Sequence, residues 1–418
     1  MADLRDNTEM PTPVNSLCKN LLLLLLASIF LWTSTGLSVS VAADIETMEA
    51  PFLHALDNTP LENRTPLILI HGIDPGRGQY DNWDLYVAAF QNNAPFQQQY
   101  KVYRYHYNPL LGVPENAALL TVALEQFLVE TRTQNMRLLA HSMGGVLLRN
   151  LSGGHLMQHH VDRIITISTP FHGTPLTIKP WIVNQKFLLS PLRGLYKLAY
   201  KITRKRHPTF MQDYCWDNFD ASMPEDVSSK VSDECHIWKP APNTQWVVYG
   251  SFYTDNEEAQ RWLTQELNTP QTLAATLENS DLRGAGLFGA RRRLVFAREK
   301  LSRLSLKKNQ ATDTDTKTYS VMSFNDGVSP INSQLWLGRF AKNPDETFIS
   351  ALARSQADQK SLTRLFAGLD HRDWMDGHTR YKNPENSQDH RVYDLLHPER
   401  EPKTTVEWVI HDLLAPAL

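Results

Sequence analysis

The sequence has almost no excess of charge of either sign. Its 418 residues include 42 lysines and arginines against 45 aspartates and glutamates, so the formal net charge is -3. Proteins whose main partner is nucleic acid usually carry a strong basic excess. The near balance therefore argues against nucleic acid as the main partner of this chain. The sequence also shows no internal repeats, and its one biased tract is an apolar run near the N-terminus.

That apolar run is too short for an ordinary membrane-spanning helix. It covers residues 21–32, about a dozen residues, whereas a spanning helix needs roughly 20. Lys19 precedes it, and small residues ending at Ala43 follow it. This order is typical of a secretory signal peptide. We therefore expect residues 1–43 to be a signal peptide cleaved after Ala43, with an uncleaved membrane anchor over residues 20–43 as the alternative. The protein is expected to be exported: periplasmic, secreted or envelope-associated.

Cysteine is also scarce. The chain has three; Cys18 precedes the apolar run, so a cleaved protein keeps only Cys215 and Cys235. An exported protein meets an oxidising compartment, where this pair is a disulfide candidate that would add about 3 kcal/mol of stability. Two unpaired thiols are the alternative. Neither cysteine lies near a plausible histidine partner motif, so neither is expected to be catalytic.

Short apolar runs alternate with helical patterns along most of the chain, after a polar leader over residues 44–64. The expected strands are residues 67–70, 101–107, 137–140, 164–168, 246–249 and 319–324, and the expected helices are 115–131 and 144–150. Strands that alternate with helices form βαβ units, which build a mostly parallel central sheet flanked by helices. The sequence therefore predicts an α/β fold in a single domain over residues 44–418. The stretches 171–243 and 253–317 lack this alternation and are expected to be lid-like insertions.

A nucleophile motif follows the expected strand at 137–140. In the run Ala140-His141-Ser142-Met143-Gly144-Gly145, a serine stands between small residues and before a helical pattern. Such a serine sits in a tight, strained strand-to-helix turn, where large side chains two positions away would clash. The turn raises the hydroxyl above the carboxyl edge of the sheet, and the helix N-terminus favours negative charge there. Ser142 is therefore the predicted nucleophile.

A serine hydroxyl needs a base, and folds of this order place an acid and then a histidine later in the chain. Asp326, in the turn Asn325-Asp326-Gly327-Val328, is the predicted acid, with Asp255 as the alternative. His371 is the predicted base; Asp326 would hold its tautomer, and it would act as general base and then general acid. The other histidines that compete for this role are His378, His390, His397 and His411.

Two backbone amides are needed to bind the oxyanion of an acyl intermediate. The first is expected to be Met143, directly after the nucleophile. The second is expected to be Ile73, because His71 and Gly72 end the strand at 67–70 and glycine lets the backbone turn there. The alternative is that His71-Gly72 only terminates the strand. The glycines that follow, at 76 and 78, are not read as a phosphate-binding loop, since no Gly-Lys-Ser/Thr accompanies them.

Together these motifs resemble the lipase and esterase branch of the α/β-hydrolase superfamily, bacterial triacylglycerol lipases in particular. The matching segments, in the same order, are Leu69-Ile70-His71-Gly72, the Ser142 run, Ile167-Ser168-Thr169-Pro170-Phe171-His172-Gly173-Thr174, Asn325-Asp326-Gly327-Val328 and Asp370-His371. The resemblance implies an α/β-hydrolase fold, a Ser-His-Asp triad, a cap over the site, ester hydrolysis and no organic cofactor. Some such lipases bind a structural calcium through an aspartate two residues after the catalytic histidine. Asp373 occupies that place, without an evident second carboxylate ligand.

Each of the two insertions carries a basic segment. Residues 193–206 lie beside an apolar stripe at helical spacing, and residues 291–308 mix arginine and lysine with leucine. A basic amphipathic helix can lie on an anionic membrane surface, where each basic residue adds roughly 1 kcal/mol. The alternative is a lid helix, or a flexible insertion, with a solvated basic face.

The sequence thus predicts a serine esterase or lipase that cleaves apolar carboxylic esters outside the cytoplasm. Deacylation of a membrane lipid, as by a phospholipase, or acyl transfer would use the same triad. A non-catalytic lipid-binding protein on a hydrolase fold is the alternative from another class.

Overall fold

The computed structural model describes residues 51–73, 83–109, 111–174, 243–252, 324–340, 348–358, 360–377 and 390–416. All of them belong to one compact unit, Pro51–Leu418. Several sequence predictions lie outside the described residues: the signal segment 1–43, Cys215, Cys235, Asp255, His378, both basic segments, and nearly all of the two insertions. Within the described part, no helix is both long and apolar enough to cross a membrane.

A seven-stranded sheet forms the centre of the unit, in the spatial order β1-β3-β2-β4-β5-β6-β7. Only β1 runs antiparallel to its neighbour; the other five pairings are parallel. The strands are β1 (Phe52–Ala55), β2 (Thr65–Ile70), β3 (Tyr100–His106), β4 (Met136–His141), β5 (Val161–Ile167), β6 (Gln245–Phe252) and β7 (Ser361–Ala367). The mostly parallel sheet predicted from the sequence is confirmed.

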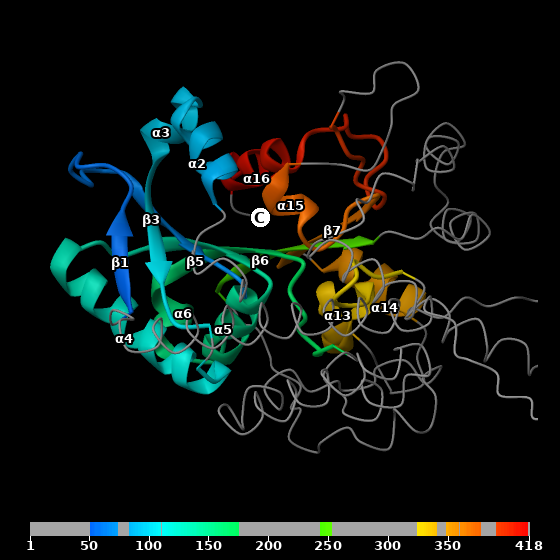
Figure 1. The fold of residues 1–418 in the computed structure, drawn as a ribbon, viewed down its shortest axis with the longest axis horizontal. Coiled ribbons are helices and arrows are strands. Elements are labelled where there is room, and N and C mark those ends of the chain that lie inside the picture. Colours follow the sequence, from blue (N-terminus) through cyan, green and yellow to red (C-terminus); the bar gives the residue numbers. More distant parts are fainter. Residues whose placement is uncertain are drawn as a thin grey trace, which may run out of the picture. The chain divides into compact units, whose positions relative to one another are not determined.

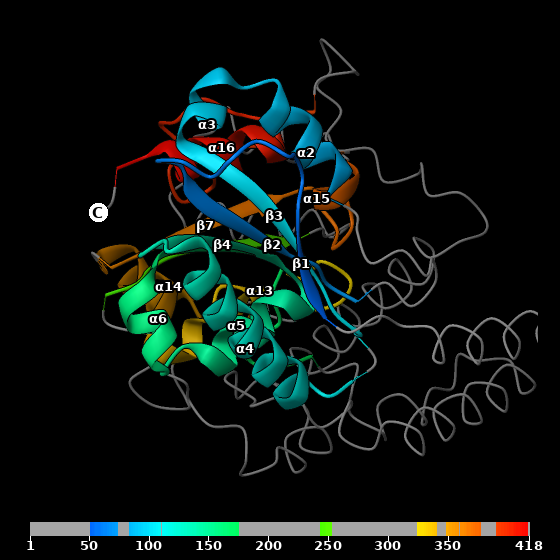
Figure 2. The same ribbon diagram turned by 90° about the vertical axis from the view of Figure 1, so that its left-hand side faces the viewer.

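Helices cover both faces of the sheet (Figures 1 and 2). One layer contains α2 (Asp84–Gln91), α3 (Ala94–Gln99), α15 (Asp373–Asp376) and α16 (Thr405–Leu414). The opposite layer contains α4 (Val113–Thr131), α5 (Met143–Leu151), α6 (His155–His160), α13 (Ile331–Gln334) and α14 (Phe348–Ala357), with the short 3-10 helix η3 (Leu337–Phe340) packed on α14. Strands covered on both faces read as continuous apolar runs. Because helices cover both faces of β2, its residues 67–70 are fully buried and all four are apolar.

Two strands differ from the sequence prediction. Residues 52–55, expected to belong to a polar leader, form the edge strand β1, whose side chains are only partly buried. The strand beside β6 is β7, which the sequence analysis did not predict, because the charged Arg364 interrupts its apolar pattern. Of the strand expected at 319–324, only Phe324 is described, and it lies in a bend. The remaining five strands and both helices appear within a few residues of their predicted bounds.

The strand order reverses direction at β2. The chain moves from β2 to β3 on one side and then crosses back to place β4 on the other side. Ligands of open α/β sheets bind outside the carboxyl ends of the strands at such a switch point. Residues 71–73 follow β2 and Ser142 follows β4 at this point. The topology therefore places the predicted nucleophile where this class of sheet binds its ligands.

Candidate active site

Ser142 occupies a strained turn between β4 and α5. Its backbone has φ 52° and ψ −120°, a combination that non-glycine residues rarely adopt. The turn is held in place because the Ser142 amide donates to the Ile167 carbonyl at 2.9 Å, and the Gly145 amide donates to the Ser142 carbonyl at 3.1 Å. Such strain persists only where the surrounding structure enforces it, and it concentrates at functional sites.

Neighbouring backbone and side-chain atoms approach the turn so closely that its glycines have no room for a side chain. A Cβ added at Gly144 would lie 2.5 Å from the Ile70 carbonyl oxygen, and one added at Gly72 would lie 2.7 Å from the Ser142 Cβ. At Gly145 the added atom would be 2.0 Å from the Thr169 hydroxyl. The small residues of the motif are therefore required by contact with β2 and with the loop after β5.

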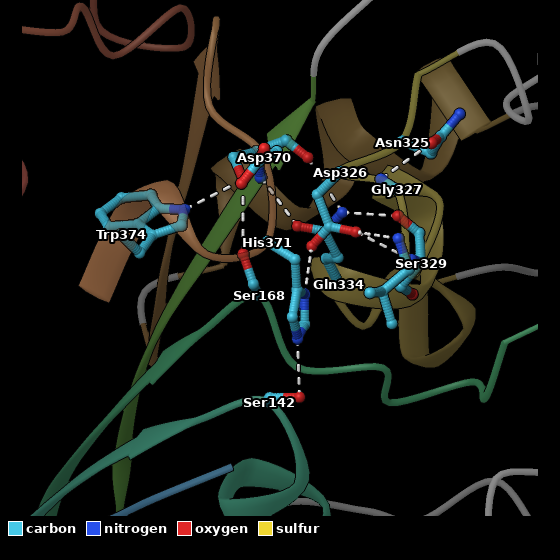
Figure 3. Close-up of polar contacts among 12 residues, drawn as sticks. Ser142, Ser168, Asn325, Asp326, Gly327, Ser329, Gln334, Asp370, His371 and Trp374 are labelled. Atoms are coloured by element: carbon cyan, nitrogen blue, oxygen red, sulfur yellow. Dashed lines mark hydrogen bonds and ion pairs between the residues drawn. The ribbon is translucent and has the colours of Figure 1, made fainter. Parts of the chain in front are cut away.

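The structure brings Ser142, His371 and Asp326 together in one line (Figure 3). His371 Nε2 lies 2.7 Å from Ser142 Oγ, and His371 Nδ1 lies 2.7 Å from Asp326 Oδ2. The residues come from three separate segments: the turn after β4, the loop between β6 and β7, and the loop after β7. All three are buried, Asp326 completely. A histidine placed between a hydroxyl and a buried carboxylate can take the hydroxyl proton while keeping one tautomer.

The Asp326 loop is fixed by its own backbone. Asp326 Oδ1 accepts the amides of Val328 and Ser329 at 2.9 and 2.8 Å, which leaves Oδ2 for His371. The loop turns at Gly327, whose φ is 89°, and the Asn325 side chain accepts the Gly327 amide at 2.9 Å. A second link is direct, since the His371 amide donates to the Asp326 carbonyl at 2.9 Å. The carboxylate is thereby oriented before any ligand binds.

Gln334 on α13 ties this loop to the sheet, a role that the sequence analysis missed. Its Nε2 donates to the carbonyls of Ser329 and Ser251 at 2.7 and 2.9 Å, and its Oε1 accepts the Ser251 amide at 2.8 Å. Ser251 Oγ in turn accepts from Trp374 Nε1 at 2.9 Å, just beyond His371. A glutamine in a four-residue helix carries no sequence signal for such a role.

His141 packs against the loop that carries His371. Its Nε2 lies 3.0 Å from the His371 carbonyl oxygen, and because a carbonyl only accepts, Nε2 carries the proton. Burial, and secondarily the nearby charge of His371, hold the pKa of His141 well below its usual range. His141 is therefore a neutral link between the nucleophile turn and the histidine loop.

His71 lies at the other predicted part of the site, after β2. Its Nδ1 lies 2.8 Å from the Gly72 carbonyl oxygen, and its ring stacks on Tyr107 with centroids 4.2 Å apart. Burial lowers the pKa of His71 to about 4. Gly72 is in contact with Ser142, as described above, and Met143 begins α5 directly after the nucleophile. The predicted amide donors of Ile73 and Met143 thus lie on the two segments that meet at Ser142.

Two of the competing histidines, His397 and His411, pair with neighbouring aspartates. His397 Nδ1 lies 2.7 Å from Asp394, and His411 Nδ1 lies 2.9 Å from Asp412. Asp373, the calcium candidate, accepts the Asp370 amide at 2.8 Å through Oδ2. Among the residues that the structure describes, no group of three or more histidine, cysteine or acidic side chains is arranged to hold a metal ion.

Comparison with known proteins gives one family match and distant structural neighbours. A family model described as a PGAP1-like alpha/beta domain matches residues 117–188, a segment that includes Ser142. No curated protein sequence matches the chain. Similar solved structures include a Bacillus licheniformis lipase in its propeptide form, at 17% identity over 51% of this chain and 43% of that chain, with a TM-score of 0.31. Others are Aspergillus fumigatus lipase B, at 15% identity over 48% and 40% of the two chains with a TM-score of 0.27, and a bacterial membrane phospholipase A, at 18% identity over 56% and 82% with a TM-score of 0.26.

The aligned region spans less than half the length of either of these lipases. The fold assignment rests instead on this chain's own features. A mostly parallel sheet is flanked by helices, an antiparallel strand lies at its edge, and a serine with positive φ joins β4 to α5 at the switch point. This arrangement is the α/β-hydrolase fold.

Proposed function

We propose that this protein is a serine hydrolase that cleaves apolar carboxylic esters through an acyl-enzyme. The observation that carries the proposal is the chain of hydrogen-bond distances from Ser142 to His371 to Asp326, 2.7 Å at each step. A lone buried serine is common, whereas a serine with positive φ, aligned with a histidine and a buried carboxylate, is the geometry of an activated nucleophile.

In the first half of the reaction, Ser142 Oγ attacks the acyl carbon while His371 Nε2 takes the hydroxyl proton. The resulting oxyanion accepts hydrogen bonds from the Met143 and Ile73 amides, and Asp326 stabilises the imidazolium. The tetrahedral intermediate then expels the alkoxide, which receives the proton from His371 Nε2. An alcohol leaves and the acyl group stays on Ser142.

In the second half, water attacks the acyl carbon and His371 Nε2 takes one of its protons. The second tetrahedral intermediate collapses, the bond to Ser142 Oγ breaks, and His371 returns the proton to that oxygen. The carboxylic acid leaves and the enzyme is restored. No step needs an organic cofactor.

The test is labelling and hydrolysis by the full chain. We expect a fluorophosphonate probe to label Ser142 and a panel of short and long acyl esters to be hydrolysed. Ser142→Ala should abolish labelling and lower kcat by about 10⁶-fold, to the background of the assay. The matched control is Ser152→Ala, because Ser152 is also buried but lies at the far end of α5, where its hydroxyl donates to the Arg149 carbonyl. Persistent labelling of Ser142→Ala would overturn the assignment.

The same experiment separates the rival functions. If the protein takes the label and, without the label, releases acyl groups only from membrane lipids, it is a lipid deacylase or phospholipase. If an added alcohol captures the acyl group in preference to water, it is an acyltransferase. A folded protein that binds lipid but takes no label is a non-catalytic member of this fold.

We further propose, on the sequence alone, that the protein is exported and that the basic segments 193–206 and 291–308 bind an anionic membrane surface. A phospholipid substrate or surface would present the negative charge that these segments complement. Co-sedimentation with vesicles rich in phosphatidylglycerol, compared with phosphatidylcholine vesicles, tests the second proposal. Equal sedimentation with both would contradict it.

A further inference from the structure

His71 makes an unusual contact with the carbonyl of the residue that follows it. Its Nδ1 lies 2.8 Å from the Gly72 oxygen. A carbonyl oxygen only accepts, so Nδ1 carries the proton and donates it. The ring has little freedom to move, because it is buried and stacks on Tyr107 with an interplanar angle of 15°. Tyr107 also donates its hydroxyl to the His71 carbonyl at 2.7 Å.

The Gly72 carbonyl and the Ile73 amide belong to one peptide group. Peptide groups are planar, and none of the described ones is cis, so the carbonyl and the amide hydrogen of this group point in opposite directions. With its oxygen on the His71 ring, this group directs the Ile73 N–H away from His71 and Tyr107. Gly72 itself lies against the nucleophile turn, since an atom added at its Cα would meet the Ser142 Cβ at 2.7 Å.

We infer that His71 is a positioning residue for the oxyanion hole: its Nδ1–H holds the Gly72–Ile73 peptide so that the Ile73 N–H faces the acyl oxygen. The inference rests on the proposed serine hydrolase function and deepens it. Glycine at position 72 allows a wider range of backbone angles than any other residue. Without the hydrogen bond the carbonyl oxygen, a hydrogen-bond acceptor, can therefore turn toward the oxyanion. An acceptor at that place would repel the developing charge instead of binding it.

The protonation state of His71 fits this role. Burial lowers its pKa to about 4, so the ring is neutral at the pH where His371 must act as a base. A neutral ring has one N–H, and the Gly72 carbonyl fixes it on Nδ1. The peptide is thus held by a donor that does not add a positive charge beside the reacting centre.

Two substitutions of His71 by an amide side chain test whether the Nδ1 hydrogen bond matters, or only the presence of a polar side chain at this position. In His71→Asn, the amide nitrogen takes the place of Nδ1 on Cγ and can still donate to the Gly72 carbonyl. In His71→Gln, the amide nitrogen takes the place of Nε2 and cannot reach it. Both variants put one amide in the same buried site, so they form a matched pair. We would measure kcat and KM for a short activated ester, affinity for an aryl boronic acid, and the thermal midpoint of each full-length variant.

We expect His71→Gln to lose about 10²-fold in kcat with KM changed less than about threefold, because one oxyanion donor is lost only in the transition state. Boronic acid affinity should fall with kcat. His71→Asn should recover kcat to within about tenfold of the parent protein. The inference is overturned if Gln keeps the parent kcat, or if Asn loses as much kcat as Gln.

A measurement on the unaltered protein keeps the inference testable if either variant does not fold. Nitrogen NMR of histidine-labelled protein should show His71 neutral and protonated on Nδ1; protonation on Nε2 would overturn the inference. The Ser142→Ala variant separates this failure from that of the proposed function. If the parent hydrolyses esters and Ser142→Ala does not, while His71→Gln remains fully active, only the role of His71 is wrong.

Discussion

Two regions of the molecule use buried polar groups in opposite ways. At the carboxyl edge of the sheet, the site region formed by Ser142, Asp326, His371 and their loops contains strained backbone and neutral histidines. On the face covered by α16, arginines of β4, β5 and β7 hold that helix; we call this region the α16 anchor. In it, Arg364 binds both oxygens of Asp412 at 2.5 and 2.6 Å.

The α16 anchor uses fixed charges at the end of a helix. Arg163 donates to the carbonyls of Asp412 and Ala415 at 2.6 and 2.7 Å, and Arg137 donates to the carbonyl of Leu413 at 2.6 Å. These carbonyls carry the negative end of the helix dipole and have no partner within the helix. The site region instead uses groups whose protonation must change during the reaction. The difference implies that separate residues control activity and stability.

The largest expected effect is on activity alone. In Asp326→Asn, the side-chain oxygen keeps the Val328 and Ser329 amides, so the amide nitrogen faces His371 Nδ1. Two donors cannot pair, so His371 moves its proton to Nε2 and loses its ability to accept from Ser142. We expect kcat to fall about 10⁴-fold, with the denaturant midpoint close to that of the parent protein.

Steady-state kinetics and chemical denaturation of the same preparation check this prediction. Asp255→Asn serves as the comparison, since Asp255 is the alternative acid. A loss of kcat in Asp255→Asn but not in Asp326→Asn would mean that the acid is assigned wrongly. A loss of stability in Asp326→Asn as large as the loss of activity would break the contrast between the two regions.

The second effect is on stability alone. Asp412→Asn leaves Arg364 buried with one carboxylate partner, Asp394, instead of two. Breaking a buried ion pair by removing one partner costs about 3 kcal/mol or more. We therefore expect a clear drop in the free energy of unfolding, with kcat unchanged below the melting range.

The control for this prediction is Asp84→Asn. Asp84 pairs with Arg104 at 3.0 Å, but its side chain is 86% exposed. Exposed ion pairs contribute about 1 kcal/mol or less. The urea midpoint of Asp412→Asn should therefore be lower than that of Asp84→Asn. Equal midpoints would show that the α16 anchor does not depend on the buried ion pair.

The residues of the site region could be predicted from the sequence, whereas those of the α16 anchor could not, for a physical reason. The Ser142 turn is encoded locally, because its strain and its close backbone contacts require small residues at fixed spacing. Asp326 and His371 were predicted from their order along the chain and from an Asn-Asp-Gly turn, which is itself a local pattern. The structure places His371 beside Ser142 and Asp326 beside His371.

The features that could not be predicted depend on contacts between residues far apart in the sequence, or on contacts with the backbone. In the sequence, the charged Arg364 interrupts an apolar strand pattern. Its ion-pair partner, Asp412, lies 48 residues later in the chain, so the pattern does not reveal it. Gln334 and Tyr107 act through backbone carbonyls, which carry no residue-specific pattern. The edge strand β1 is half-exposed and short, so its apolar content is too low for the usual signal.

The last prediction compares how the two regions change the stability of the protein as the pH is lowered. Burial lowers the pKa of His71 to about 4 from the ordinary histidine value of 6.5, so between these values the unfolded chain takes up a proton that the native protein does not. Stability therefore falls as the pH drops from 6.5 to about 4, by up to about 3 kcal/mol from His71. Burial holds the pKa of His141 low as well, so it acts in the same direction.

The α16 anchor titrates in a lower window. Burial alone would raise the pKa of Asp412, but hydrogen bonds from His411 and Arg364 outweigh it and lower the pKa to about 2 from 3.8. The stability that Asp412 contributes is present above 3.8 and is lost as the pH falls toward 2, by about 2 kcal/mol. Urea unfolding across this pH range should show two separate declines. His71→Asn should flatten the upper decline only and Asp412→Asn the lower one only; if either substitution flattens both, the two regions are not independent.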